Sequence, residues 1–213
     1  MKLYFLPGAP SPNRVRLYIS EKNAISKIIQ IDEISLAGGK QKEPLHIARN
    51  SLAKVPVLEV AENSFIHESL AIIEYLEELF PEPSMFGPTP IERAKTRAAE
   101  RVAEIRVFYP LGRYVQATVT QRSRFPDPAV AAHFKTQFPI GLSYLNQLVK
   151  AKGPFLMGEN VTMADCTLAA TLEFARVHEI NVLDEYEALS EWFERYRERT
   201  AAQRIFVQQD TLA

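Results

Sequence analysis

The chain has 213 residues, of which 46% are hydrophobic and 24% are charged, and its formal net charge is -1. This length and composition predict a folded globular protein of one large or two small domains. The near-zero net charge gives no general attraction to nucleic acid or to an anionic membrane, so neither is expected as a partner.

The single cysteine, Cys166, excludes an intrachain disulfide and a metal site built from several cysteines. The apolar run at the start of the chain is too short for a signal peptide and ends at Pro7-Gly8. No segment reaches the length of a transmembrane helix. We therefore expect a cytoplasmic protein in a reducing compartment.

Strand and helix patterns alternate over residues 1–80. The expected elements, in chain order, are a strand Lys2 to Leu6, a helix Asn13 to Asn23, a strand Lys27 to Ile31, a helix Glu43 to Arg49, a hairpin of Pro56 to Val60 and Asn63 to Ile66, and a helix Ser69 to Phe80. This βαβαββα order predicts an α/β domain with a mixed sheet and helices on its faces.

The proline-rich segment 81–90 is the best candidate for a linker, because only helical patterns follow it. The expected helices are Ile91 to Gln121 with a kink at Pro110, Ala129 to Lys150 with an interruption near Pro139, Met163 to Val177, and Glu185 to Arg199. The sequence thus predicts a first domain over residues 1–80 and an all-helical domain over residues 91–213.

The bond between Val55 and Pro56 precedes the hairpin. In the simplest interpretation, the proline only starts a strand. A cis bond at this position would instead leave the N–H and C=O of Val55 free to pair with the backbone of a peptide ligand.

Glu68 and Ser69 open the helix that follows the hairpin. An acidic residue at a helix start is common for structural reasons alone. The same free N–H groups, with the Ser69 hydroxyl, also suit a carboxylate, while the Glu68 carboxylate suits an ammonium group. The sequence therefore predicts a site for a small acidic peptide.

The loop Gly8-Ala9-Pro10-Ser11-Pro12-Asn13 joins the first strand to the first helix. Ser11 has the form of a helix cap, with Pro12 at the first helical position. A thiolate beside this helix end would gain from the helix dipole and from a hydroxyl or amide donor, so that the pKa of the thiol falls. Both roles are compatible, because a capping hydroxyl can also donate outward.

The remaining polar candidates favour structural roles. Thr162 to Asp165 has the form of a capping box, which makes Asp165 a stabiliser of the helix rather than a catalyst. Cys166 follows inside the helix and is expected to be a small buried residue. The histidines show no spacing typical of metal ligands, and no metal is expected.

Four stretches, KLYFLPGAPSPNRVRLYI, KVPVLEV, ESLAIIEYLEELFP and GENVTMADCTLAA, together resemble the soluble glutathione transferase superfamily in their order and spacing. The resemblance covers nearly the whole chain and is nearest to bacterial theta-, nu- or beta-like members. It implies a thioredoxin-like domain, a C-terminal helical domain and assembly as a homodimer.

The resemblance also implies glutathione as the co-substrate. Val55 and Pro56 would pair with the cysteinyl backbone, and Glu68 and Ser69 would hold the γ-glutamyl end. The loop that reaches the glycyl carboxylate would contribute Gln41 and Lys42.

For the group that contacts the sulfur, the resemblance to classes that use the first turn of the first helix favours Ser11, with Asn13 second. Tyr4 is a poor third, because it lies inside the strand. Beta-class members have cysteine where this chain has Pro10, which puts chemistry through a protein thiol in doubt.

Two positions depart from the pattern of some serine-class members. Leu70 stands where these have an arginine, and Ala53 where these have a histidine. Binding of glutathione would then use a residue of the helical domain, for which Arg106 is the candidate. The electrophile would contact the helix through Phe108, Tyr109, Arg113 and Tyr114, although some of these side chains could serve only in helix packing.

Three functions follow from the resemblance. The first is a glutathione transferase, in which the thiolate attacks a small hydrophobic electrophile. The second is a glutathione-dependent reductase of disulfides or peroxides. The third is a non-catalytic binding or regulatory protein, against which the intact Val-Pro and Glu-Ser pairs argue.

Overall fold

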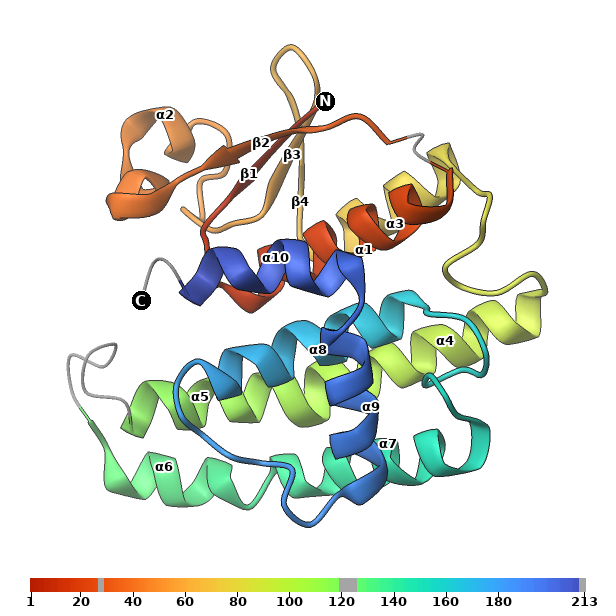
Figure 1. Cartoon of the computed structure of the whole chain (residues 1–213). Helices are drawn as coiled ribbons and strands as arrows, with labels where there is room; N and C mark the ends of the chain where they lie inside the picture. Colours follow the sequence, from red (N-terminus) through yellow and green to blue (C-terminus); the bar gives the residue numbers. More distant parts are fainter. Residues whose placement is uncertain (27–28, 119–125, 211–213) are drawn as a thin grey trace. The chain divides into compact units, whose positions relative to one another are not determined.

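The computed structural model describes residues 1–26, 29–118 and 126–210 and divides the chain into two compact units (Figure 1). The first unit contains Met1–Met85 together with the C-terminal segment that begins at Thr200, and the second contains Phe86–Arg199.

The first unit is built around a four-stranded sheet of order β2-β1-β3-β4. Strand β1 runs parallel to β2 and antiparallel to β3, which in turn pairs antiparallel with β4. The elements are β1 (Lys2–Phe5), α1 (Pro10–Ser26), β2 (Asp32–Ser35), a 3-10 segment η1 (Ala37–Lys42), α2 (Pro44–Ile47), β3 (Val57–Ala61), β4 (Ser64–His67), α3 (Ser69–Leu79) and α10 (Thr200–Asp210). The predicted βαβαββα order and the mixed, thioredoxin-like sheet are confirmed.

Helices α1 and α3 pack against each other in this unit. Helix α3 buries Ile72, Ile73 and Leu76 completely, at the spacing of one helical face. Each such side chain stabilises the fold by about 1.5–3 kcal/mol relative to an exposed position.

The second strand begins at Asp32 and not within the predicted range Lys27 to Ile31. Residues 29–31 do not belong to a strand, and residues 27 and 28 lie outside the described part. The Asn23 side chain donates to the Ile29 carbonyl and accepts from the Ile29 N–H, both at 2.8 Å. Since both backbone groups of Ile29 are engaged, it cannot pair in the sheet.

The C-terminal helix α10 was not predicted, and its residues were expected in the helical domain. The structure places it in the first unit, where it packs against α1 (Figure 1). Its buried side chains include Ala202, Ile205 and Phe206.

The second unit is helical, as predicted. Its elements are α4 (Pro90–Val102), a π-helical segment η2 (Ala103–Phe108), α5 (Tyr109–Thr118), α6 (Pro128–Lys135), α7 (Phe138–Lys152), α8 (Met163–Arg176) and α9 (Glu187–Arg197). Helix α8 is buried along almost its whole length, from Met163 to Ala175, and forms the centre of the core. None of the helices in the described ranges is long and apolar enough to span a lipid bilayer.

The predicted irregularity at Pro110 takes the form of the π-helical segment just before it. There the Tyr109 N–H bonds to the Glu104 carbonyl, five residues earlier. Proline lacks an N–H, and its ring collides with the carbonyl four residues earlier in a regular α-helix. A wider turn before the proline avoids this conflict, so α4, η2 and α5 form one continuous long helix.

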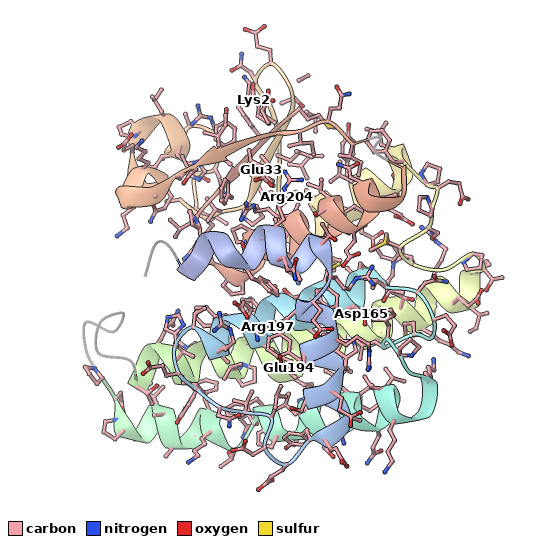
Figure 2. The ribbon with its side chains drawn as sticks, viewed as in Figure 1. Lys2, Glu33, Asp165, Glu194, Arg197 and Arg204 are labelled. Atoms are coloured by element: carbon pink, nitrogen blue, oxygen red, sulfur yellow. The ribbon has the colours of Figure 1, made fainter. Side chains whose placement is uncertain are left out.

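Asp165 has the structural role that its motif predicts. Its carboxylate accepts hydrogen bonds from the N–H and hydroxyl of Thr162, at 2.9 and 2.8 Å. It also accepts from the Leu156 N–H and the Trp192 indole, at 2.9 and 3.1 Å. The side chain, labelled in Figure 2, thereby joins the start of α8 to α9. Burial raises the pKa of the Asp165 carboxyl, and the donated hydrogen bonds oppose this shift.

Candidate functional site

The register of the sheet brings the predicted glutathione segments to one edge. Tyr4 of β1 pairs with Val57, the first residue of β3, and Val57 pairs with His67, the last residue of β4. The neighbouring pair of β1 and β2 ends at Phe5 and Ser35. The segments that carry Ser11, Gln41, Val55 and Glu68 therefore all leave the sheet at this edge.

The first helix begins earlier than predicted. It starts at Pro10, so Ser11 lies in its first turn and is not its cap. The Asn13 N–H bonds to the Ala9 carbonyl, which identifies Ala9 as the cap residue. Two prolines fit this turn because the first N–H groups of a helix have no partner within it.

The Ser11 side chain is half-buried, and its hydroxyl makes no hydrogen bond to another described residue. It is therefore available to donate to a ligand. Asn13 is different, because it is 1% exposed and its side-chain oxygen accepts from Arg16 at 3.4 Å. Of the two predicted sulfur contacts, Ser11 is the better placed.

The bond between Val55 and Pro56 is cis, as the resemblance implied. Side chains hold the loop before it: the Lys54 carbonyl lies 2.9 Å from His46 Nε2 and accepts from Asn50 Nδ2 at 3.1 Å. The backbone N–H and C=O of Val55 have no hydrogen-bond partner in the described ranges. They are therefore free to pair with an extended ligand.

Glu68 adopts a left-handed backbone conformation, with φ of 65°, directly before α3. A residue other than glycine is uncommon there, and such conformations gather at ligand-binding sites. The Glu68 side chain is exposed. It is thus accessible to an ammonium group of a ligand.

The Ser69 hydroxyl accepts a hydrogen bond from Arg14 Nε at 2.7 Å. Both residues are buried, with 2% and 4% exposure respectively. Arg14 was not among the predicted site residues. The available signal was a charged side chain close to the start of α1, but its partner lies 55 residues away in the chain.

Gln41 and Lys42 lie at the end of η1, after two glycines with φ of 74° and 88°. The side-chain oxygen of Gln41 is buried and has no hydrogen-bond partner among the described residues. Such an atom is costly to leave unpaired. A ligand that donates an N–H would satisfy it, and a glutathione backbone carries such groups.

Tyr4, the third candidate for the sulfur, is already engaged. Its hydroxyl donates to Glu59 Oε2 at 2.6 Å, and the Arg49 guanidinium lies 4.2 Å from its ring centre. Burial and the bond to Glu59 raise the pKa of the Tyr4 phenol. The hydrogen of this phenol is therefore not available to a ligand thiol.

The residues of the helical unit that were predicted to contact ligands do not all line the same cleft. Tyr109, Arg113 and Arg106 line one cleft, to which Phe108 and Tyr114 do not contribute. Tyr114 packs on Phe138 with ring centres 5.7 Å apart, which supports a packing role. The role of Arg106 in glutathione binding stays a prediction.

No group of three side chains able to hold a metal ion is found in the ranges that the structure describes.

Two family descriptions match the chain. "Glutathione S-transferase, N-terminal domain" matches residues 3–84, and "Glutathione S-transferase, C-terminal domain" matches residues 117–203.

Glutathione S-transferase 2 of Saccharomyces cerevisiae is 30% identical, with 96% of this chain and 89% of the relative covered. A maleylacetoacetate isomerase of Pseudomonas aeruginosa is 28% identical, with 81% and 80% covered. The crystal structure of Gtt2 from Saccharomyces cerevisiae superposes with a TM-score of 0.82 at 30% identity, over 96% of this chain and 100% of that one.

Proposed function

This chain belongs to the soluble glutathione S-transferase superfamily, and we propose that it is a glutathione transferase that attacks a small hydrophobic electrophile with the thiolate of glutathione. The observation that carries the proposal is the convergence of Ser11, Val55, Glu68 and Ser69 at one edge of the sheet.

In this proposal the unpaired backbone of Val55 binds the cysteinyl residue of glutathione. Ser69, held by Arg14, and the free N–H groups at the start of α3 bind the γ-glutamyl carboxylate. Exposed Glu68 pairs with the ammonium group. Gln41 accepts from the glycyl end and Lys42 pairs with its carboxylate.

These contacts place the thiol beside the first turn of α1. The Ser11 hydroxyl donates to the sulfur, and the helix dipole stabilises its negative charge. The thiol releases its proton to solvent and the sulfur forms a bond to the electrophilic carbon, from which the leaving group departs with its electron pair. The protein thus contributes in two ways: it lowers the pKa of the glutathione thiol, and it holds the thiol close to the electrophile.

The replacement Ser11→Ala tests this role. We expect kcat/KM for conjugation to fall about 100-fold, as for loss of one donor to a developing anion, while glutathione still binds. The ultraviolet absorbance of the bound thiolate should appear at higher pH than in the unchanged protein, because the thiolate loses a donor.

Ser143→Ala is the matched control, since Ser143 is exposed on α7. An unchanged rate and an unchanged pH of thiolate formation in Ser11→Ala would remove Ser11 from the mechanism.

The relative named maleylacetoacetate isomerase favours glutathione-dependent isomerisation as a second candidate. The two reactions differ in thiol balance, because conjugation consumes one thiol per turnover and isomerisation consumes none. Thiol titration during turnover distinguishes them.

A small disulfide as substrate tests the reductase alternative. Calorimetric titration with glutathione tests the non-catalytic alternative, which predicts that glutathione does not bind at millimolar concentration.

A further inference from the structure

A cleft of about 430 Å³ lies within the helical unit. Helices α5 and α6 border it and lie side by side (Figure 1). Its lining comprises Ile105, Arg106, Tyr109, Pro110, Arg113, His133, Phe134 and Gln137. A volume of this size accommodates a small organic molecule.

The cleft is cationic. Arg106 and Arg113 line it, and among the residues that the structure describes no carboxylate does. Neither arginine makes an ion pair in the ranges that the structure describes. The acidic residue nearest to Arg106 in the chain, Glu104, is paired with Arg101. Arg113 Nη1 donates to Gln116 Oε1 at 3.5 Å, but this partner is neutral, so both guanidinium groups can bind an anionic ligand.

The rest of the lining is mostly apolar or aromatic, with His133 and Gln137 as its other polar side chains. Tyr109 is 63% exposed and Ile105 50% exposed, which is high for side chains of this kind. Arg113 lies 5.9 Å from the ring centre of Phe134, and the His133 ring meets Phe134 edge-on. The aromatic groups thus lie beside the cationic ones.

We propose that this cleft binds an organic carboxylate with a flat, unsaturated or aromatic body. The planar guanidinium of Arg106 or Arg113 binds a carboxylate through two parallel hydrogen bonds, which an ammonium group cannot match. Tyr109 and Phe134 cover the apolar body. Resting on the proposed function, this ligand is the electrophilic co-substrate, so the transferase prefers anionic electrophiles.

A benzoate with chlorine para to the carboxylate and a nitro group ortho to the chlorine is a suitable probe, because that nitro group activates the carbon–chlorine bond. Its uncharged amide is the matched comparison. The glutathione sulfur forms a bond to the ring carbon that carries chlorine, the carbon–chlorine bond breaks, and chloride leaves with the bonding pair. The thiol proton goes to solvent, so no further reactant is needed.

The first measurement is calorimetric binding of both probes to the full chain without glutathione. We expect the carboxylate to bind about tenfold more tightly than the amide, and Arg113→Gln to abolish this preference. Arg204→Gln is the control, since Arg204 is exposed on α10 outside the cleft (Figure 2). Equal binding of the two probes, no binding of either, or a preference that survives Arg113→Gln and Arg106→Gln would overturn the proposal.

The second measurement is conjugation of both probes. The ratio of KM for the amide to KM for the carboxylate should fall about tenfold in Arg113→Gln and not in Arg204→Gln. If carboxylate binding responds to Arg113 but no probe is conjugated, the cleft is supported and the proposed transferase function fails. If both probes are conjugated equally well, the transferase function is supported and the proposed carboxylate site fails.

Discussion

Buried and half-buried polar side chains hold the backbone around the proposed glutathione site. Arg14 bonds to the Ser69 hydroxyl, His46 contacts the Lys54 carbonyl, and His67 lies 2.7 Å from the carbonyl of Arg49. Each of these contacts joins a side chain to the start of a helix or to a loop. Such support keeps binding groups in place before the ligand arrives, which reduces the entropy cost of binding.

Arg14→Gln should raise KM for glutathione about tenfold, because Ser69 loses a charge-assisted donor. Arg14→Lys keeps the positive charge and should restore part of the loss. Initial rates at varied glutathione concentration measure the effect, and circular dichroism verifies that each variant is folded. A folded Arg14→Gln protein with unchanged KM would show that Arg14 does not position Ser69.

Tyr4→Phe should raise the pKa of Glu59. The Tyr4 hydroxyl is the main cause that holds the pKa of the Glu59 carboxyl below its ordinary value, and Lys2 adds to the effect. Because this pKa is lowered in the folded state, its contribution to stability is present above the ordinary glutamate pKa and is lost as pH falls through the lowered value. The variant should therefore show a weaker dependence of unfolding on acid pH.

Titration of the Glu59 carboxyl by nuclear magnetic resonance measures this shift directly. Glu62, which is exposed in the turn after β3, serves as the reference carboxyl within the same sample. An unmoved Glu59 titration in Tyr4→Phe would assign the shift to Lys2 and Arg49 instead.

Among the elements, the π-helical segment η2 depends on a glycine in a neighbouring helix. A Cβ atom on Gly141 of α7 would lie 2.7 Å from a methyl group of Val107 and 2.8 Å from the Arg106 carbonyl. These distances are below any normal contact, so only glycine permits α7 to approach η2 so closely. The same approach places the backbone of Arg106 beside α7.

Gly141→Ala should lower the free energy of unfolding by about 1–3 kcal/mol, the usual cost of overpacking. Gly112→Ala is the matched control, because a Cβ there meets only a Phe108 carbon at 4.0 Å. That change should stabilise the helix by about 0.5–1 kcal/mol. Urea unfolding measures both variants, and equal stability of the two would contradict the packing argument.

At the scale of the whole molecule, each of the two units has its own buried core. Within the first unit, the buried Glu77 carboxylate accepts from Lys22 at 2.5 Å and from Tyr18 at 2.7 Å. It also accepts from the Ser84 hydroxyl and the Met85 N–H, at 2.8 and 3.0 Å. This network ties α1 and α3 to the last residues of the unit, where the chain passes into the helical one.

Lys22→Met should destabilise the first unit by about 3–5 kcal/mol, because it leaves Glu77 buried without its cation. Addition of Glu77→Gln should recover part of this loss by removing the charge. Lys2→Met is the control. It breaks the ion pair between Lys2, labelled in Figure 2, and Glu59, and should change stability far less than Lys22→Met because this pair is partly exposed to solvent. Thermal unfolding measures all three variants.

The expected homodimer, and the expected cytoplasmic location, stay predictions.

Local patterns in the sequence were enough for most of the elements. Helical spacing of apolar residues identified α3 and α8, and the Thr162 to Asp165 motif identified the start of α8. The Val-Pro bond and the Glu-Ser pair predicted two parts of the candidate site. The helix predictions are confirmed because each depends on residues within one or two helical turns, where propensity and capping act.

By itself, then, the sequence determined the βαβαββα order, the helical second half and the family. Only the tertiary structure decided that β2 begins at Asp32, that α10 packs on α1, that Arg14 holds Ser69, and that Tyr109 and Arg113 share a cleft while Tyr114 packs on Phe138. The physical reason is the same throughout: each of these outcomes depends on a partner that lies elsewhere in the chain, and the fold selects that partner by burial and hydrogen bonding.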